Sequence, residues 1–389
     1  MRRPTTICHP ELVSGSSVNN NSKTLMKILF DHQIFVSQKN GGISRFFCNL
    51  IAHLKQEKNT EILLPVVEHE NEYLKEFTNI INPKIAPSKI QKFLKKDQNF
   101  VAINSFFESG NFDIFHPTYY SKYFLEHLKN KPFVTTIHDM TYELYPEFFS
   151  PKDQTANLKL ESAKRAKKII VVSENTKKDL IRLTDIKEEK IAVIAQACSL
   201  DTSINIDRNL LISPNQEYLL YVGTRGIYKN FYFTVLAIEK TLKDNPNLNL
   251  LCFGQPFNKK EKTFLASHGL DKKVFAIQGD DSTLVGLYKN ALAFLAPSYC
   301  EGFYVTLLEA FACGCPVLAS NKEPIPEVAG DAAIYFDPKD NLTIKASVEK
   351  IISDSNLRKK MSAKGLERNK LFTWQNVARQ TRELYESIL

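Results

Sequence analysis

Two glutamates, Glu301 and Glu309, lie on either side of the predicted start of a helix. Gly302 places the first of them in a loop, and an apolar run that begins near Val305 places the second inside the helix. The free N–H groups at the start of such a helix favour a phosphate, because they carry the positive end of the helix dipole. The two carboxylates could then bind the hydroxyl groups of a sugar or a ribose. Paired acids are also common by chance, so this spacing needs support from other parts of the chain.

A pair of cations, Arg225 and Lys229, follows the predicted strand at residues 217–223. Both lie in the loop between that strand and a predicted helix at residues 231–242. An arginine can grip a phosphate with two parallel hydrogen bonds, and a lysine supplies a mobile point charge. The loop could therefore bind a diphosphate. The alternative is a basic loop that only faces the solvent.

His138 and Asp139 directly follow another predicted strand, at residues 133–137. Ligands of parallel sheets bind at the carboxyl ends of the strands, which is where these two residues lie. A histidine there can hydrogen-bond a substrate hydroxyl or move a proton. The alternative is a structural histidine that ends the strand or pairs with Asp139. His116 also follows a strand, but its aromatic neighbours favour a position in the core.

Two glycines, Gly41 and Gly42, stand between a predicted strand at residues 27–31 and an apolar helix that runs through Leu54. A strand, a glycine turn and a helix form the opening unit of a doubly wound α/β domain. The turn lacks the G-x-G-x-x-G pattern, which disfavours a dinucleotide-binding dehydrogenase. The glycines either approach a ligand closely or simply allow a tight turn.

The sequence predicts no metal site. The seven cysteines are odd in number and lie mostly in apolar runs, which is typical of reduced, buried thiols in a cytosolic protein. Cys313 and Cys315 have no second cysteine pair or nearby histidine to complete a set of four ligands. Asp280 and Asp281 precede a predicted helix at residues 283–291, so a turn and a helix cap explain them better than a divalent cation.

Length and composition indicate a two-domain globular protein. A chain of 389 residues exceeds what one core usually organises. Hydrophobic residues make up 43% and charged residues 24%, which is ordinary for a soluble protein, and no apolar run approaches the roughly 18 residues of a membrane-spanning helix. The net charge of +8 permits contact with anionic lipid or phosphorylated substrates, but the dense basic tracts of nucleic-acid binders are missing.

Short apolar runs alternate with helical patterns through both halves of the chain, as a parallel sheet requires. Polar residues without periodicity at 201–216 mark the predicted boundary between domains. We therefore expect domains at residues 26–200 and 201–370, a terminal helix at residues 371–389 and a disordered extension at residues 1–25, with Met26 as a natural start. The other predicted strands lie at residues 62–67, 114–116, 168–172, 248–253, 274–277, 292–295, 316–319 and 333–336.

Residues 88–96 carry four lysines beside three apolar residues at helical spacing. This is the pattern of a basic amphipathic helix that could lie on an anionic membrane surface. A solvated helix that packs its apolar side on the core is an equal alternative.

Together these residues give the chain a resemblance to a known family. It resembles the retaining glycosyltransferases of the GT-B class, in the large family marked by E-x7-E (group 1, or family 4), over nearly all of residues 26–389. The strongest match runs from Glu301 through Glu309, A-C-G and P-V to P-E-V-A-G, which ends at Gly330. The patterns around His138 and Lys229 are similar to those of bacterial transferases of mannose and related sugars.

The resemblance implies a fold of two Rossmann-like domains that face each other across a cleft, with the terminal helix near Trp374 crossing back to the first domain. The second domain would hold the nucleotide sugar. Arg225 and Lys229 would neutralise its diphosphate, Glu301 would contact the transferred sugar and Glu309 would bind the ribose. Further donor contacts would come from Gly302 and from the backbone of Phe303, Tyr304 and Val305. His138, Gly41 and Gly42 would approach from the first domain.

Two positions depart from the family pattern. Many members have glycine where this chain has Tyr304, which predicts a narrower pocket and a less close backbone approach. The family's arginine usually follows the strand's glycine directly, whereas Arg225 is displaced by one, so Lys229 is the firmer assignment.

The resemblance implies transfer of a hexose, with mannose as the first candidate, from a GDP- or UDP-linked sugar to a glycan or lipid-linked glycan. The anomeric configuration would be retained without a protein nucleophile, a metal or any other cofactor. We expect a cytoplasmic protein that could lie peripherally on the inner face of the membrane and binds no nucleic acid. The alternatives are a GT-B sugar-nucleotide epimerase or hydrolase, and a catalytically silent scaffold subunit.

Overall fold

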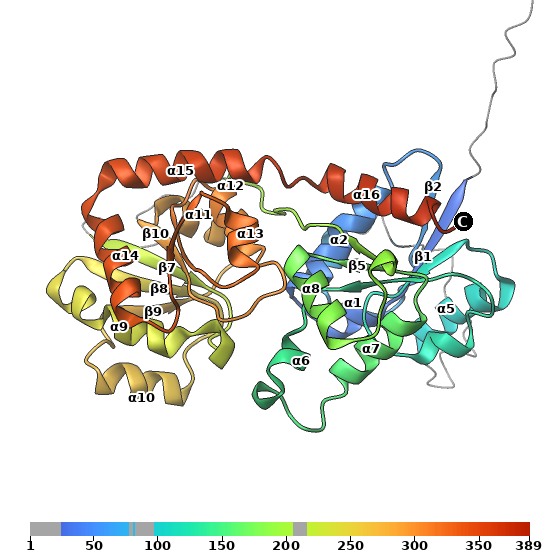
Figure 1. Ribbon diagram of the computed structural model, residues 1–389, viewed down its shortest axis with the longest axis horizontal. Helices are drawn as coiled ribbons and strands as arrows, with labels where there is room; N and C mark the ends of the chain where they lie inside the picture. The colour runs from blue at the N-terminus through green and yellow to red at the C-terminus, as the bar shows by residue number, and fades with distance from the viewer. Residues whose placement is uncertain (1–24, 78–80, 82–96, 205–215) are drawn as a thin grey trace, which may run out of the picture.

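The computed structural model describes residues 25–77, 81, 97–204 and 216–389 (Figure 1). In it the chain forms two α/β domains that lie side by side, each built on parallel strands. The alternating pattern of the sequence therefore predicts the α/β fold class correctly. The predicted basic helix at residues 88–96, and all of the predicted extension at residues 1–25 except Leu25, lie outside the described residues.

The described part of the N-terminal domain holds two groups of parallel strands, in the orders β2-β1-β3 and β4-β5-β6. A parallel bridge between Phe115 and Phe133 connects β3 to the start of β4, so the groups continue one another. The prediction of a strand at residues 62–67 was wrong at its end, because Pro65 has no N–H to donate and the strand stops before it. The strands are β1 (Met26–Phe30), β2 (Thr60–Leu63), β3 (Ile114–His116), β4 (Val134–Ile137), β5 (Lys168–Val171) and β6 (Ile191–Val193).

Helices flank these strands, and α2 begins at the predicted site residue Gly42. The α-helices are α1 (Gln33–Ser37), α2 (Gly42–Leu54), α3 (Glu72–Glu76), α5 (Gln98–Ser109), α6 (Thr141–Leu144), α7 (Thr155–Arg165) and α8 (Glu174–Leu183). Short 3-10 helices are η2 (Tyr123–Glu126), η3 (Pro146–Phe148) and η4 (Glu188–Lys190). Ser173 caps α8 by accepting a hydrogen bond from the backbone N–H of Thr176.

The C-terminal domain has a six-stranded parallel sheet in the order β12-β11-β10-β7-β8-β9 within the described residues. In chain order this is the 3-2-1-4-5-6 arrangement of dinucleotide-binding folds. The strands are β7 (Glu217–Val222), β8 (Leu248–Phe253), β9 (Val274–Ile277), β10 (Ala293–Ala296), β11 (Val317–Ser320) and β12 (Ala333–Phe336). The helical segments are η6 (Ile227–Lys229), α9 (Phe231–Asp244), α10 (Lys259–Ser267), α11 (Asp281–Asn290), α12 (Thr306–Ala312), α13 (Ile325–Ala329), α14 (Asn341–Ser353) and α15 (Ser355–Asn369). The chain then continues into α16 (Trp374–Glu386), which packs on the N-terminal domain.

The direction of strand order reverses between β7 and β10, which are neighbours in the sheet. The connections that leave these two strands diverge and open a crevice at their carboxyl ends, where doubly wound sheets bind ligands. The loops concerned are residues 223–230 and 297–305. They contain Arg225, Lys229 and Glu301, so the topology itself points to the predicted residues.

The last helix links the two domains. Figure 1 shows α15 lying along the C-terminal domain and α16 lying over the N-terminal one. Trp374 and Tyr385 of α16 belong to the core cluster of the N-terminal domain. The Tyr385 hydroxyl lies 2.5 Å from Nδ1 of His116, whose Nε2 lies 2.9 Å from Oγ1 of Thr136. Burial lowers the pKa of His116 to about 3, so this histidine is a neutral core residue that fastens the chain end.

None of the described helices has the length and apolar character needed to cross a membrane.

Candidate active site

Lys229 and Glu301 meet at the switch point of the C-terminal sheet. Lys229 ends η6, which follows β7, and Glu301 lies in the loop after β10. Lys229 Nζ is 2.6 Å from Glu301 Oε1, and both side chains are largely buried. A hydrogen bond of 2.8 Å from the N–H of Tyr299 to the carbonyl oxygen of Tyr228 ties the two loops together. The fold thus joins one cation and one carboxylate that the sequence predicts to act on the same ligand.

Lys229 carries a stable positive charge. Burial alone would lower its pKa, but the negative charge of Glu301 and the nearby tyrosines raise the pKa overall. The lysine is therefore protonated at neutral pH. A cation fixed in this way can stabilise negative charge that develops on a phosphate without rearranging during the reaction.

Tyr304 has a left-handed backbone with a φ of 73°, which is rare for a bulky residue. Its buried ring lies 4.9 Å from Lys229 Nζ, within reach of a cation–π interaction. The chain thus keeps the backbone conformation that a glycine adopts most easily and adds a ring beside the ammonium group. Of the neighbouring predicted residues, Phe303 is buried edge-on against Phe372, and Val305 is the N-cap of α12.

Gly302 touches the N-terminal domain directly. A Cβ atom at this position would lie 1.6 Å from the backbone oxygen of His138. The carbonyl oxygen of Gly302 accepts hydrogen bonds from Oγ of Ser173 at 2.6 Å and from Oγ1 of Thr176 at 3.2 Å. The loop that carries Glu301 is therefore in contact with the ends of β4 and β5, and only a glycine fits at this point.

The side chain of His138 is buried behind this contact. Burial lowers the pKa of His138 to about 4, although Asp139 acts in the opposite direction, so its ring is neutral at physiological pH. Nδ1 lies 3.4 Å from Nε2 of Gln196, and Nε2 has no hydrogen-bond partner among the described residues. A buried polar atom without a partner is the kind of group that a bound hydroxyl can satisfy.

Arg45 is a site residue that sequence reasoning missed. Gly41 caps α2, Gly42 is its first residue, and Arg45 lies one turn further along the helix. Its guanidinium pairs with Asp281 of α11, and its Nη1 is 3.9 Å from Oε1 of Glu309 in α12. The glycine turn is thereby connected to the C-terminal domain. The position of a cation one turn beyond the two glycines was the available signal, but its partners are distant in sequence.

Within the part of the chain that the structure describes, the buried carboxylate of Glu309 has Tyr288 and Arg45 as its side-chain partners. Its Oε2 accepts a hydrogen bond of 3.3 Å from the hydroxyl of Tyr288, and Arg45 approaches its other oxygen. Burial raises the pKa of Glu309, and the charge of Arg45 only partly offsets this. A carboxylate in this state has unused acceptor capacity that ribose hydroxyls could fill.

Arg225 is not brought to the Lys229–Glu301 pair. Its Nε is 2.8 Å from Oε1 of Glu261, and its Nη2 donates to the carbonyl oxygens of Gln255 and Pro256 at 2.7 and 3.1 Å. Only Nη1 lacks a partner among the described residues. The guanidinium is therefore largely committed to the loop between β8 and α10, and Lys229 is the better placed of the two predicted cations.

The acidic and thiol groups that could suggest a metal have other partners in the described residues. Asp280 caps α11 by accepting the N–H of Thr283 at 2.9 Å, and Asp281 pairs with Arg45. No cluster of three or more histidine, cysteine, aspartate or glutamate side chains suited to a metal occurs in the part of the chain that the structure describes. Sγ of Cys315 donates to the carbonyl oxygen of Pro316 at 3.5 Å. Burial raises the pKa of the Cys313 thiol to about 12 and also raises that of Cys315, so both thiols stay protonated.

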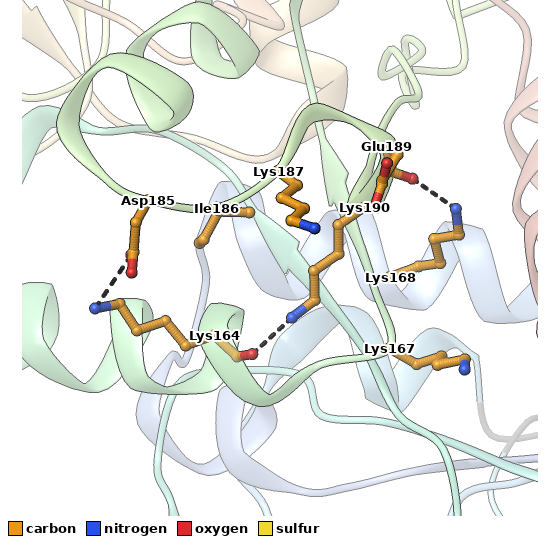
Figure 2. Close-up of a pocket in the computed structure, with 8 residues that line it drawn as sticks. All are labelled: Lys164, Lys167, Lys168, Asp185, Ile186, Lys187, Glu189 and Lys190. Carbon is orange, nitrogen blue, oxygen red and sulfur yellow. Dashed lines mark hydrogen bonds and ion pairs between the residues drawn. The ribbon is translucent and has the colours of Figure 1, made fainter.

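A basic recess of about 560 Å³ lies away from this site (Figure 2). Lys164 pairs with Asp185 at 3.4 Å, and Lys190 donates to the carbonyl oxygen of Lys164 at 2.6 Å. Lys168 begins β5, and Lys190 directly precedes β6. The recess therefore lies at the amino ends of the strands, on the opposite edge of the sheet from the candidate site, and it takes no part in it.

The pKa of Glu309 predicts a distinctive pH dependence. A raised pKa means that the folded state binds more protons than the unfolded state above pH 4.5, so the free energy of unfolding falls as pH rises through that window. Glu309→Gln removes this effect. We expect the free energy of unfolding of Glu309→Gln, measured by urea denaturation, to rise relative to that of the wild type as pH rises from about 4.5 to 8.

Glu239 on α9 is the matched control, because hydrogen bonding to Lys243 lowers its pKa. Glu239→Gln should lose stability relative to the wild type as pH rises, which is the opposite sign. If the free energy of unfolding changed equally with pH in the wild type and in Glu309→Gln, folding would not raise the pKa of Glu309.

Comparison with family models assigns both halves of the chain. Residues 203–368 match the model "Glycosyl transferases group 1", and residues 40–201 match "Glycosyltransferase Family 4". Among characterised proteins, the chain is 31% identical over 287 residues to the O-antigen chain mannosyltransferase B of Escherichia coli. That alignment covers 70% of this chain and 74% of the relative.

Solved structures show the same two-domain fold. A sucrose-phosphate synthase from Thermosynechococcus elongatus superposes with a TM-score of 0.72 at 18% identity, covering 93% of this chain and 99% of the other. HepE from Anabaena, solved in complex with UDP-glucose, gives a TM-score of 0.71 at 16% identity, covering 93% and 100%. The GT-B prediction is therefore confirmed, and the chain belongs to the group 1 and family 4 glycosyltransferases.

Proposed function

We propose that the protein is a retaining hexosyltransferase, with mannose as the first candidate sugar and a nucleoside diphosphate as the leaving group. The observation that carries this proposal is the buried Lys229–Glu301 pair at the switch point, with Glu309 on the helix that follows. The mannosyltransferase name of the Escherichia coli relative supports the sugar. The UDP-glucose complex of HepE supports the donor class, and GDP- and UDP-linked sugars are both candidates.

Lys229 and Glu301 would divide the work on the donor. Lys229 would neutralise the diphosphate, because it is the buried, protonated cation at the crevice. Glu301 would accept hydrogen bonds from hydroxyls of the transferred sugar, while its contact with Lys229 keeps both side chains oriented. Such fixed electrostatic groups act most strongly where water is excluded.

The reaction would break the bond between the anomeric carbon and a diphosphate oxygen. The acceptor hydroxyl would form its new bond on the same face of the sugar, and its proton would pass to the departing phosphate oxygen. No covalent intermediate with the protein is required. The chain's contribution is then orientation and stabilisation of the charge on the leaving group, which Lys229 is positioned to supply.

The N-terminal domain would close the site over the donor sugar. Gly302 packs against the backbone of His138, and Arg45 connects the Gly41–Gly42 turn to Glu309. His138 is neutral, and its Nε2, which has no hydrogen-bond partner among the described residues, would hydrogen-bond a donor hydroxyl. We infer that this closure assembles the reactive geometry only when both domains touch the donor.

We propose that no metal ion takes part, because the permanent charge of Lys229 can perform the charge neutralisation. Arg225 would join it only if its Nη1, which has no partner in the described residues, reached the phosphate. Transfer that continues in excess EDTA would support this view, and loss of transfer that returns with a divalent cation would overturn it.

A thermal-stabilisation screen with a panel of nucleotide sugars tests the proposed function. A ligand that binds only the folded state raises its melting temperature, so one nucleotide sugar should stand out in the wild type. The same ligand should give a smaller shift with Glu301→Gln. Free sugar or an epimerised nucleotide as the main product would favour the hydrolase or epimerase alternative. Intact glycan assembly in cells that carry Glu301→Gln would favour the scaffold alternative.

Glu309 is expected to set a preference for ribose. The wild type should bind a nucleoside diphosphate more tightly than its 2′,3′-dideoxy analogue, because a buried carboxylate rejects a ligand that leaves its acceptors unpaired. Glu309→Leu should weaken binding of the ribonucleotide about tenfold and abolish the preference. Calorimetric titration with both ligands measures this, and a preference that persists in the variant would assign the ribose to other residues.

The acceptor would be a saccharide, either free or linked to a lipid. The name of the Escherichia coli relative refers to an O-antigen chain, which supports a growing glycan. We place the protein in the cytoplasm, in peripheral contact with the membrane. Cell fractionation with a low-salt and a high-salt wash tests this location, because an electrostatic attachment weakens with salt.

A further inference from the structure

Residues 141–149 project from the N-terminal domain beside the candidate site. Figure 1 shows α6 and the chain that leads from it to α7 extending away from the body of the domain. The segment starts three residues after His138. Oγ1 of Thr141 lies 3.7 Å from Sγ of Cys300, the residue before Glu301. The projection is therefore continuous with the place where the donor sugar is proposed to lie.

This segment carries four aromatic side chains, which we call the α6–η3 platform: Tyr142, Tyr145, Phe148 and Phe149. The rings of Tyr142 and Phe149 stack with centroids 3.8 Å apart, and those of Tyr145 and Phe148 are parallel with centroids 5.3 Å apart. All four side chains are only half-buried, and none belongs to the four hydrophobic core clusters. Aromatic rings outside any core retain faces that a ligand can cover.

A buried lysine holds the platform in place. Lys159 of α7 is 1% exposed, and its Nζ donates to the carbonyl oxygen of Asp139 at 2.7 Å. The same Nζ is 2.8 Å from Oε2 of Glu143 and 5.7 Å from the ring centroid of Tyr142. Burying a lysine is unfavourable unless its charge is paired, so this network fixes the first turn of the segment. A rigid platform loses little conformational entropy on binding.

The surroundings of the platform favour a neutral, hydroxyl-rich ligand. Oε1 of Glu143 has no hydrogen-bond partner among the described residues, although the side chain is only 8% exposed. The charges of Asp139 and Asp153 contribute to raising the pKa of Tyr142, although burial is the main cause, so acidic groups lie close to the rings. Acidic groups repel phosphate headgroups but accept hydrogen bonds from hydroxyls.

We propose that the α6–η3 platform is a binding subsite for sugar rings of the acceptor beyond the ring that receives the transferred hexose. One face of a pyranose presents C–H groups, which pack on the electron-rich face of an aromatic ring, while hydroxyls at the rim reach acidic side chains. The proposal rests on the proposed transferase function. It implies that the enzyme acts preferentially on acceptors of two or more sugar units.

The experiment compares acceptors of one, two and three sugar units that end in the same residue, in series built from mannose, glucose and rhamnose. In the best series, the acceptor KM of the wild type should fall about tenfold on lengthening the acceptor. In Tyr145→Ala and Phe148→Ala, the acceptor KM should no longer fall as the acceptor is lengthened. The kcat and KM for the single-unit acceptor should stay unchanged. If the acceptor KM of these variants falls with acceptor length as much as that of the wild type, the platform does not bind the acceptor. The same conclusion follows if the wild-type KM does not fall with length in any series.

Saturation-transfer NMR with the trisaccharides supplies a readout that does not need turnover. Signals from the outer rings should be strong in the wild type and lost in Tyr145→Ala, and unchanged outer-ring signals would overturn the proposal. Phe264→Ala is the control, because Phe264 is a half-buried aromatic packed edge-on against Tyr232 in the other domain. A wild type that binds no nucleotide sugar would instead refute the proposed function, whatever the saccharide signals show.

Discussion

Replacing Lys229 by methionine is expected to reduce kcat/KM for the nucleotide sugar about a thousandfold, which corresponds to about 4 kcal/mol. Lys229 Nζ lies 2.6 Å from Glu301 Oε1 in a largely buried setting. The substitution removes the charge that would stabilise the leaving diphosphate and leaves the carboxylate without its partner, so both effects act in the same direction. Steady-state kinetics with saturating acceptor measures the loss.

Lys240→Met controls for the general effect of removing a lysine. Lys240 forms an exposed ion pair with Asp244 on α9, and such surface pairs contribute little to the stability of a protein. The kcat/KM of Lys240→Met for the nucleotide sugar should match that of the wild type. A Lys229→Met enzyme within tenfold of the wild type would mean that another group, with Arg225 as the first candidate, neutralises the diphosphate.

Replacing Gly302 by alanine is expected to reduce kcat/KM about a hundredfold without unfolding the protein. The added Cβ would lie 1.6 Å from the backbone oxygen of His138 and 2.9 Å from Cβ of Asp139, so the two domains could not make this contact. Each domain also has a core cluster built from its own residues, together with α16 in the N-terminal domain, and Gly302 belongs to neither cluster. Closure over the donor would be lost while folding is retained.

Small-angle scattering and thermal denaturation separate these effects. Gly302→Ala should give a larger radius of gyration than the wild type at a similar melting temperature. Gly226→Ala is the control, because a Cβ there would meet only the ring of Tyr228 at an ordinary distance of 3.6 Å. A Gly302→Ala enzyme with wild-type activity would mean that the contact with His138 plays no part in the reaction.

The parts of this site that the sequence predicts are those that depend on local pattern. A buried parallel strand appears in the sequence as a short apolar run, so these strands could be predicted. Because Lys229, Glu301 and His138 follow such runs, they were expected at the carboxyl edges of their sheets. Glycine marked Gly302 as a loop position, and the apolar periodicity put Glu309 in a helix. These features need only a few neighbouring residues to be recognised.

The parts that sequence reasoning missed depend on contacts between distant segments. Arg45 and Asp281 are 236 positions apart, and nothing local to either indicates the other. Arg225 was expected on the diphosphate, but Glu261 in a separate helix holds its guanidinium. The contact between the ring of Tyr304 and Lys229, which the left-handed backbone of Tyr304 allows, was also not foreseen. In each case the partner becomes visible only when the elements are packed.

The most direct test of the account is NMR analysis of the product formed from an α-linked nucleotide sugar and a saccharide acceptor in excess EDTA. The account predicts an α-linked product from the wild type and none above background from Lys229→Met. A β-linked product, or transfer by Lys229→Met at the wild-type rate, would contradict a retaining site centred on Lys229 and Glu301.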